Sequence, residues 1–148
     1  MIYQGAMNVG RGIELMMAAM EHLPDCELWL VGGGPMLEQW KNEAAELAWR
    51  DRIRFYGWVN YQDLPPITAQ ASLGLSLEED RGMSYHLALP NKLFDYLQAG
   101  LPVVVADLPE MRRVVEDYEV GAVLRAREPE VLAEQVRAIL EPNRWQQY

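Results

Sequence analysis

A glycine-rich segment near the N-terminus has the residue types to bind a phosphate. In residues 5–12, Gly5, Gly10 and Gly12 flank Arg11. Glycines let a backbone approach a ligand closely, a helix N-terminus attracts anions, and an arginine fork can donate to phosphate oxygens. The spacing is not G-x-G-x-x-G, so the dinucleotide-binding fingerprint is absent. A turn with an exposed arginine is the competing interpretation.

A second candidate lies in residues 84–96, around the start of a predicted helix. Asn91 is a residue type that caps helix N-termini, and Lys92 and Asp95 follow in the first turns. Cations prefer the other end of a helix, so Lys92 is explained if an anion is bound beside it. Asp95 can accept two hydrogen bonds from ribose hydroxyls, although an ordinary acid of the first turn would have the same pattern.

Four further candidates are weaker. Gly33, within residues 32–35, and Trp58, after a glycine, each follow a predicted strand, where a turn can also contact a phosphate or a base. His86 is the one candidate for acid–base catalysis, although a lone histidine is more often a surface or structural residue. The acidic run at residues 78–80 is predicted to be solvated, with projection toward a bound sugar as the alternative.

Composition limits the classes of protein. The 148 residues suit one domain. Thirteen Lys and Arg face 22 Asp and Glu, and the net charge of −9 argues against a nucleic-acid-binding surface. With one cysteine and two histidines, no internal disulfide and no metal-ligand cluster is expected. No apolar run approaches the roughly 20 residues of a membrane span, and the N-terminus does not resemble a signal peptide, so we expect a cytoplasmic protein.

Short apolar runs alternate with helical periods along the chain. Strands are predicted at residues 27–31, 52–56, 71–77, 101–106 and 120–124, with residues 1–5 as a run too short to judge alone. This alternation predicts an α/β fold, a doubly wound, Rossmann-like parallel sheet of about six strands with residues 103–105 in a central strand. Ligands of such sheets bind beyond the carboxyl ends of the strands. The candidate segments above lie in those loops or in the first turns of the helix that follows.

Two finer expectations concern the second half of the chain. Residues 78–89 show no clean period and are predicted to form a loop. In the helix that follows, Leu93, Phe94 and Leu97 are predicted to face the core.

The motifs together resemble a known family. The most specific is Leu89-Pro-Asn-Lys-Leu-Phe-Asp-Tyr-Leu-Gln-Ala-Gly-Leu-Pro-Val-Val104, and residues 3–5, 11–15, 30–35 and 55–59 follow the same family's pattern. Nearly the whole chain resembles the C-terminal, nucleotide-sugar donor domain of GT-B glycosyltransferases of family 4, or group 1. The resemblance places Arg11 on the donor diphosphate and Asp95 on the ribose. The residues assigned to the donor are Gly5, Arg11, Gly12, Gly33, Trp58, Val59, Asn91, Lys92 and Asp95, with no metal ligand.

The chain departs from the family pattern at two positions. Ala6 stands where an arginine often follows the first glycine, and Leu87 stands where the common form has the first acid of a pair. His86, Asn91 or Lys92 can take part of that work.

The resemblance also implies a function. Residues 1–148 would be one donor-binding domain, needing an N-terminal acceptor domain and inactive by itself. The whole protein would be a retaining, metal-independent hexosyltransferase of polysaccharide or glycolipid biosynthesis, cytoplasmic or peripheral at the membrane. It would use a UDP- or GDP-linked sugar and no other cofactor. Alternatives are a nucleotide-sugar epimerase of the same fold and a non-catalytic nucleotide-sugar-binding domain, which the altered acid pair favours.

Overall fold

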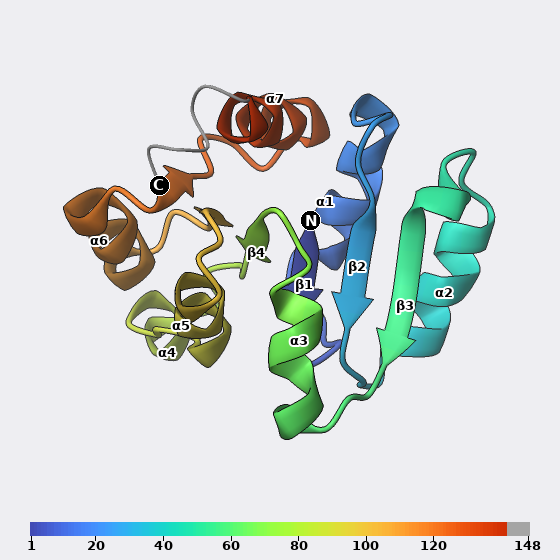
Figure 1. Cartoon of the computed structure of the whole chain (residues 1–148), viewed down its shortest axis with the longest axis horizontal. Helices are drawn as coiled ribbons and strands as arrows, with labels where there is room; N and C mark the ends of the chain where they lie inside the picture. Colours follow the sequence, from blue (N-terminus) through green and yellow to red (C-terminus); the bar gives the residue numbers. More distant parts are fainter. Residues whose placement is uncertain (142–148) are drawn as a thin grey trace.

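A six-stranded, all-parallel sheet forms the centre of the computed structural model, which describes residues 1–141. The strand order is β3-β2-β1-β4-β5-β6 (Figure 1). The strands are β1 (Ile2–Gln4), β2 (Leu28–Val31), β3 (Ile53–Gly57), β4 (Gly74–Ser76), β5 (Val103–Val105) and β6 (Gly121–Val123). This order is that of the doubly wound Rossmann fold, so the predicted fold class is confirmed.

Helices cover both faces of the sheet. The helices are α1 (Ile13–Ala19), α2 (Leu37–Ala45), α3 (Leu64–Thr68), α4 (Met83–His86), α5 (Asn91–Gln98), α6 (Pro109–Tyr118) and α7 (Pro129–Leu140). Short 3₁₀ turns lie at Met20–His22, Arg50–Arg52 and Tyr61–Asp63. Residues of α1, α2 and α7 share one core cluster, and residues of α3, α5 and α6 share the other. No helix within residues 1–141 is long and apolar enough to cross a membrane.

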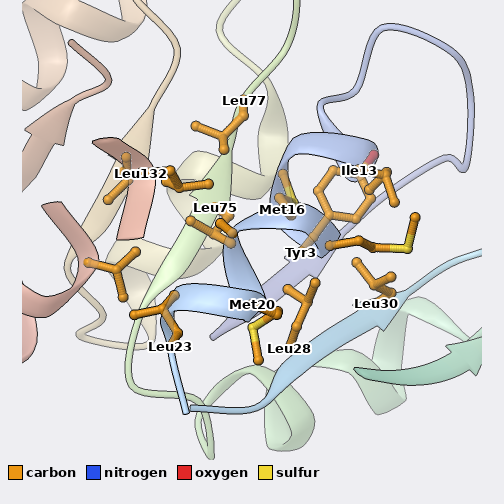
Figure 2. Packing of buried hydrophobic residues seen from close by; sticks show 14 of the residues in the cluster. Tyr3, Ile13, Met16, Met20, Leu23, Leu28, Leu30, Leu75, Leu77 and Leu132 are labelled. Atoms are coloured by element: carbon orange, nitrogen blue, oxygen red, sulfur yellow. The ribbon is translucent and has the colours of Figure 1, made fainter. Parts of the chain in front are cut away.

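Side chains along β1 point alternately to the two faces of the sheet and pack against the helices on each face. Tyr3 packs into the α1 cluster with Met16 and Leu75, as Figure 2 shows, whereas Ile2 packs into the α5 cluster. Side chains two residues apart share a face of a strand. Gln4 therefore lies on the α3 and α5 side, and Ser76 and Glu78 share a face at the end of β4 in the same way.

The short run at the N-terminus forms β1, in the middle of the sheet, and residues 103–105 form the internal strand β5, as predicted, beside the edge strand β6. Two other elements differ from the sequence prediction. The segment predicted as a loop contains the one-turn helix α4. Asn91 is the first residue of α5 rather than its cap, because Pro90 takes the N-cap position with extended backbone angles.

The inward face of α5 also differs from the prediction. Leu93 is buried and Leu97 partly buried, but Phe94 is 44% exposed. Tyr96 takes the place against the sheet, because Gly74 of β4 has no side chain where the Tyr96 ring lies. Leu93 and Tyr96 are three positions apart, which puts them on one helix face, whereas Phe94 is rotated away from it.

Candidate functional site

Three cavities have walls that include residues at or just beyond the carboxyl ends of the strands, and the second of them lies between α3 and α5. The first, of about 290 Å³, is lined by Gly5, Gly33, Trp58 and Val59, among others. The second, of about 330 Å³, has Asp95 in its wall and shares Gln4 and Leu64 with the first. The third, of about 300 Å³, is lined by residues that include Arg11 and Glu78. Of the residues that the sequence singled out, His86, Gly12, Asn91 and Lys92 line none of the three cavities.

Backbone-to-backbone packing shapes the first cavity. The Gly5 N–H donates to the Val31 carbonyl at 2.9 Å, which ties the end of β1 to the end of β2. Gly32 has φ 136°, and a side chain there would meet the Gly5 carbonyl directly. Trp58 stands 74% exposed at the mouth of this cavity, beside Gly33. The result is a smooth glycine floor with an aromatic side chain available for stacking.

The loop of residues 5–12 is fixed onto the end of β4. Gly12 has φ 77°, and a Cβ atom there would lie 2.5 Å from the Leu77 carbonyl oxygen. On the other side of Arg11, the Gly10 carbonyl accepts a hydrogen bond from the Glu79 N–H at 2.9 Å. These two contacts bring Arg11 beside Glu78.

A buried charge cluster lies at this junction. Lys92 Nζ donates to Glu78 Oε1, and Arg11 Nη1 lies 3.9 Å from the same oxygen. Ser76 Oγ donates to the other carboxylate oxygen of Glu78 at 2.8 Å. Glu78 is 3% exposed and Lys92 is 8% exposed.

The prediction of a solvated acidic run is therefore wrong at Glu78. This residue follows the buried strand β4 directly and shares the face of Ser76, which turns it under α5 rather than toward water. Asp80 is exposed, as predicted. Glu79 is partly exposed and lies 3.1 Å from Arg81 Nε.

The anion beside Lys92 is the side chain of Glu78, where the sequence analysis expected a bound ligand. Burial alone would raise the pKa of the Glu78 carboxyl, but the Lys92 charge and the hydrogen bonds from Lys92 and Ser76 outweigh burial and lower that pKa. Glu78 is thus ionised at neutral pH. Burial lowers the pKa of the Lys92 ammonium, and the Glu78 charge acts against this change. The ammonium also lies 4.7 Å from the centre of the Tyr3 ring, at a cation–π distance.

One hydrogen-bond donor of Arg11 has no partner within the described residues. Its Nε atom is buried and has no hydrogen-bond partner among residues 1–141. Its guanidinium carbon lies 5.8 Å from the centre of the Tyr85 ring, and a quarter of the side chain is exposed. A buried donor without a partner costs free energy, and an anion that accepted its hydrogen bond would remove that cost. The guanidinium of Arg11 is therefore suited to bind an added anion.

Asp95 is held by a polar chain that sequence reasoning missed. Gln4 Nε2 donates to Asp95 Oδ2 at 2.9 Å, and Thr68 Oγ1 donates to Gln4 Oε1 at 2.7 Å. The Gln4 N–H donates to the Tyr96 hydroxyl, which in turn donates to the Leu75 carbonyl. The available signal was a glutamine at the carboxyl end of a buried strand, next to Gly5.

His86 and Asn91 lie apart from this arrangement. His86 Nδ1 is 3.1 Å from Asp80 Oδ2, in a pair that is about half exposed, and their hydrogen bond lowers the pKa of Asp80. Asn91 is exposed at the start of α5. Within residues 1–141, no group of three His, Cys, Asp or Glu side chains is placed to hold a metal ion.

Known proteins are similar to this chain in sequence. The chain is 32% identical over 129 residues to the phosphatidyl-myo-inositol mannosyltransferase of Mycobacterium leprae, a match that covers 86% of this chain and 32% of that protein. It is 28% identical over 99 residues to the chitobiosyldiphosphodolichol beta-mannosyltransferase of Candida glabrata, which covers 67% of this chain and 21% of the relative. The chain therefore spans about a fifth to a third of the length of these relatives.

Solved structures share the same architecture at low identity. The Anabaena protein HepE in complex with UDP has a TM-score of 0.80 at 17% identity, covering 96% of this chain and 39% of HepE. The catalytic domain of cholesterol-alpha-glucosyltransferase from Helicobacter pylori has a TM-score of 0.75 at 19% identity, covering 96% of this chain and 86% of that one.

The family is given by the sequence match along almost the whole chain. The family model described as glycosyl transferases group 1 matches residues 1–142. With this match, the Rossmann-like sheet and the relatives named above, the chain belongs to the glycosyl transferases group 1 family.

Proposed function

We propose that this chain is the donor-binding domain of a glycosyltransferase and that a nucleoside-diphosphate sugar binds along the carboxyl edge of its sheet. The observation that carries the proposal is that three kinds of group lie together at this edge. Two cations, Arg11 and Lys92, lie at the loop of residues 5–12, Asp95 lies in the wall of the second cavity, and Trp58 stands at the mouth of the first. Diphosphate, ribose and base need these three kinds of group.

Each part of the donor then has a proposed set of partners. Arg11, Lys92 and the backbone at Gly5 and Gly12 would hold the diphosphate. Asp95, oriented by Gln4, would accept the ribose hydroxyls. Trp58 and Val59 would contact the base over Gly33. The complex of HepE with UDP supports a nucleoside diphosphate as the ligand, and UDP and GDP are the proposed carriers.

The proposed reaction is transfer of a hexose with departure of the nucleoside diphosphate. Arg11 and Lys92 would stabilise the negative charge that develops on the departing diphosphate. We propose a metal-independent reaction, because these side chains supply the positive charge and the sequence has no Asp-x-Asp motif. A retaining outcome rests on the family resemblance. The names of the relatives include both a beta-mannosyltransferase and an alpha-glucosyltransferase.

The surface around the site supports a second domain. Large apolar side chains are exposed on the loops and first helical turn at this edge, namely Val9, Trp58, Tyr61, Met83, Leu87, Leu89 and Phe94. Such a concentration of apolar surface marks an interaction site. We propose that an acceptor-binding domain of the same protein covers it and excludes water during transfer. This assignment is supported by the match to only about a fifth to a third of the length of the relatives. In this proposal the chain alone binds the donor but does not transfer the sugar.

Replacing Asp95 with alanine tests the division of roles within the site. Loss of hydrogen bonds from a ribose to a charged acceptor is expected to lower the affinity for UDP or GDP by about 10-fold or more. Inorganic pyrophosphate has no ribose, so its affinity should stay within about twofold of wild type. Calorimetric titration of both ligands measures the two effects, with Asp117→Ala on the exposed face of α6 as the control. An equal loss of both ligands in Asp95→Ala would show that Asp95 does not act on the ribose.

A further inference from the structure

The buried carboxylate of Glu78 occupies a place suited to a ligand anion. We propose that Glu78 is an internal counter-anion, which pairs with Lys92 and Arg11 in the unliganded protein and competes there with a phosphate of the ligand. The inference rests on the proposed function, because it takes these two cations as the diphosphate-binding groups. The inference adds Glu78 to the site as a residue that lowers the affinity for the ligand rather than raising it.

The contacts of Glu78 are those of an anion in a binding site. One carboxylate oxygen accepts from Lys92 and lies 3.9 Å from Arg11, and the other accepts from the Ser76 hydroxyl at 2.8 Å. The carboxylate thus collects a lysine, an arginine and a hydroxyl, which are three of the groups that proteins use to bind phosphate oxygens.

The two cations are also within reach of an incoming anion. Arg11 and Glu78 line the same cavity of about 300 Å³, so an anion that enters it meets the guanidinium that faces Glu78. Lys92 lies under the exposed Gly5, where a Cβ atom would be 3.2 Å from Lys92 Cε. Because Gly5 has no side chain, only backbone separates the lysine stem from the ligand side of the loop.

Charge gives the sign of the effect. Two cations and one carboxylate leave this cluster with a single positive charge, in a chain whose net charge is −9. A diphosphate carries more than one negative charge, so Glu78 both repels it and shares its partners. Removing the charge of Glu78 is therefore expected to strengthen the binding of a diphosphate. A purely structural ion pair predicts the opposite, because Lys92 would lose the partner that holds it in place.

The test is Glu78→Gln, with inorganic pyrophosphate and UDP as probes. Without ligand the variant should melt at a lower temperature than wild type, because Lys92 is left buried without its counter-charge. Pyrophosphate should bind the variant roughly 10-fold more tightly, since a nearby like charge is gone. It should also raise the melting temperature of the variant by more than that of wild type.

Glu79→Gln is the matched control for this experiment. It removes the same charge from the next residue, whose carboxylate pairs with Arg81 and lies 4.0 Å from Arg127, and it should leave pyrophosphate affinity within about twofold of wild type. If Glu78→Gln does not fold, Ser76→Ala takes its place. That variant frees one carboxylate oxygen, so Glu78 is displaced more easily and pyrophosphate should bind roughly threefold more tightly.

The outcomes separate this inference from the proposed function. Unchanged or weaker pyrophosphate binding in Glu78→Gln, or in Ser76→Ala where that replaces it, overturns the role of Glu78. If wild type still binds UDP in that case, the proposed function stands. If wild type and the variants bind neither UDP nor pyrophosphate, both the inference and the proposed function are overturned.

Discussion

Lys92→Met is expected to lower the free energy of unfolding by about 3–5 kcal/mol, the range for breaking a buried ion pair by removing one partner. The reason is that Glu78, 3% exposed, would stay in the interior with only Ser76 and the more distant Arg11 as partners. Methionine has a length close to that of lysine, so little packing is lost. Denaturant unfolding measures the effect.

The pH dependence of this loss identifies its cause. In wild type the pKa of Glu78 is held below its ordinary value of 4.5. The ionised carboxylate therefore contributes to the free energy of unfolding above pH 4.5, and this contribution is lost as the pH falls through the lowered pKa. In Lys92→Met, burial should instead raise the pKa of Glu78, which makes the protonated form at low pH the better tolerated one. The difference in stability should therefore be largest near neutral pH and shrink on acidification.

Lys41→Met is the control for Lys92→Met. Lys41 pairs with Glu38 at 2.9 Å on the surface of α2, where an ion pair contributes about 0–1 kcal/mol. If the two variants lose the same stability, or if the loss in Lys92→Met is independent of pH, the buried pair does not have the role described for it.

Arg11→Ala is expected to weaken the binding of both nucleoside diphosphate and pyrophosphate by about 1.5–3 kcal/mol, the range for a hydrogen bond to a charged group. This corresponds to roughly 10- to 150-fold in affinity. The physical reason is the loss of a guanidinium whose buried Nε has no partner within residues 1–141 and whose fork suits a phosphate. Calorimetric titration at two salt concentrations measures it, since the loss of a charge contact should also reduce the salt dependence of binding.

Two variants frame the Arg11 result. Arg11→Lys keeps the charge but not the fork, so its affinity should lie between those of wild type and Arg11→Ala. Arg54→Ala removes an exposed arginine near the amino end of β3, where it pairs with Glu27, and should leave affinity unchanged. A loss in Arg54→Ala equal to that in Arg11→Ala would point to net charge rather than to a specific contact.

The fold was predictable from the sequence because a buried parallel sheet has a local signature. Its strands are covered on both faces, so they are apolar throughout, and glycines and prolines separate them from the helices. The run Leu101–Ala106 is the clearest example and contains β5. The inward face of α5 was predicted only in part, because burial of Tyr96 rather than Phe94 depends on Gly74, a residue of another strand.

The sequence singled out Arg11 and Lys92, which the structure brings together, but it did not single out Glu78, the acid between them. A lysine in the first turn of a helix indicates a nearby anion, and from Lys92 a bound anion was inferred. That the anion is Glu78 depends on a contact across 14 residues, and the neighbouring acids Glu79 and Asp80 made the run look solvated. The signal that could have found Glu78 is its position directly after a buried strand, at the edge where ligands bind.

Titration of the wild-type chain with UDP, GDP and ADP, alongside Arg11→Ala and Asp95→Ala, tests the central claim most directly. The claim is that this chain binds a nucleoside diphosphate at the carboxyl edge of its sheet. The predicted result is saturable one-to-one binding of UDP or GDP that both substitutions weaken by about 10-fold or more. Absence of binding by either nucleotide, or binding that neither substitution changes, would contradict the claim.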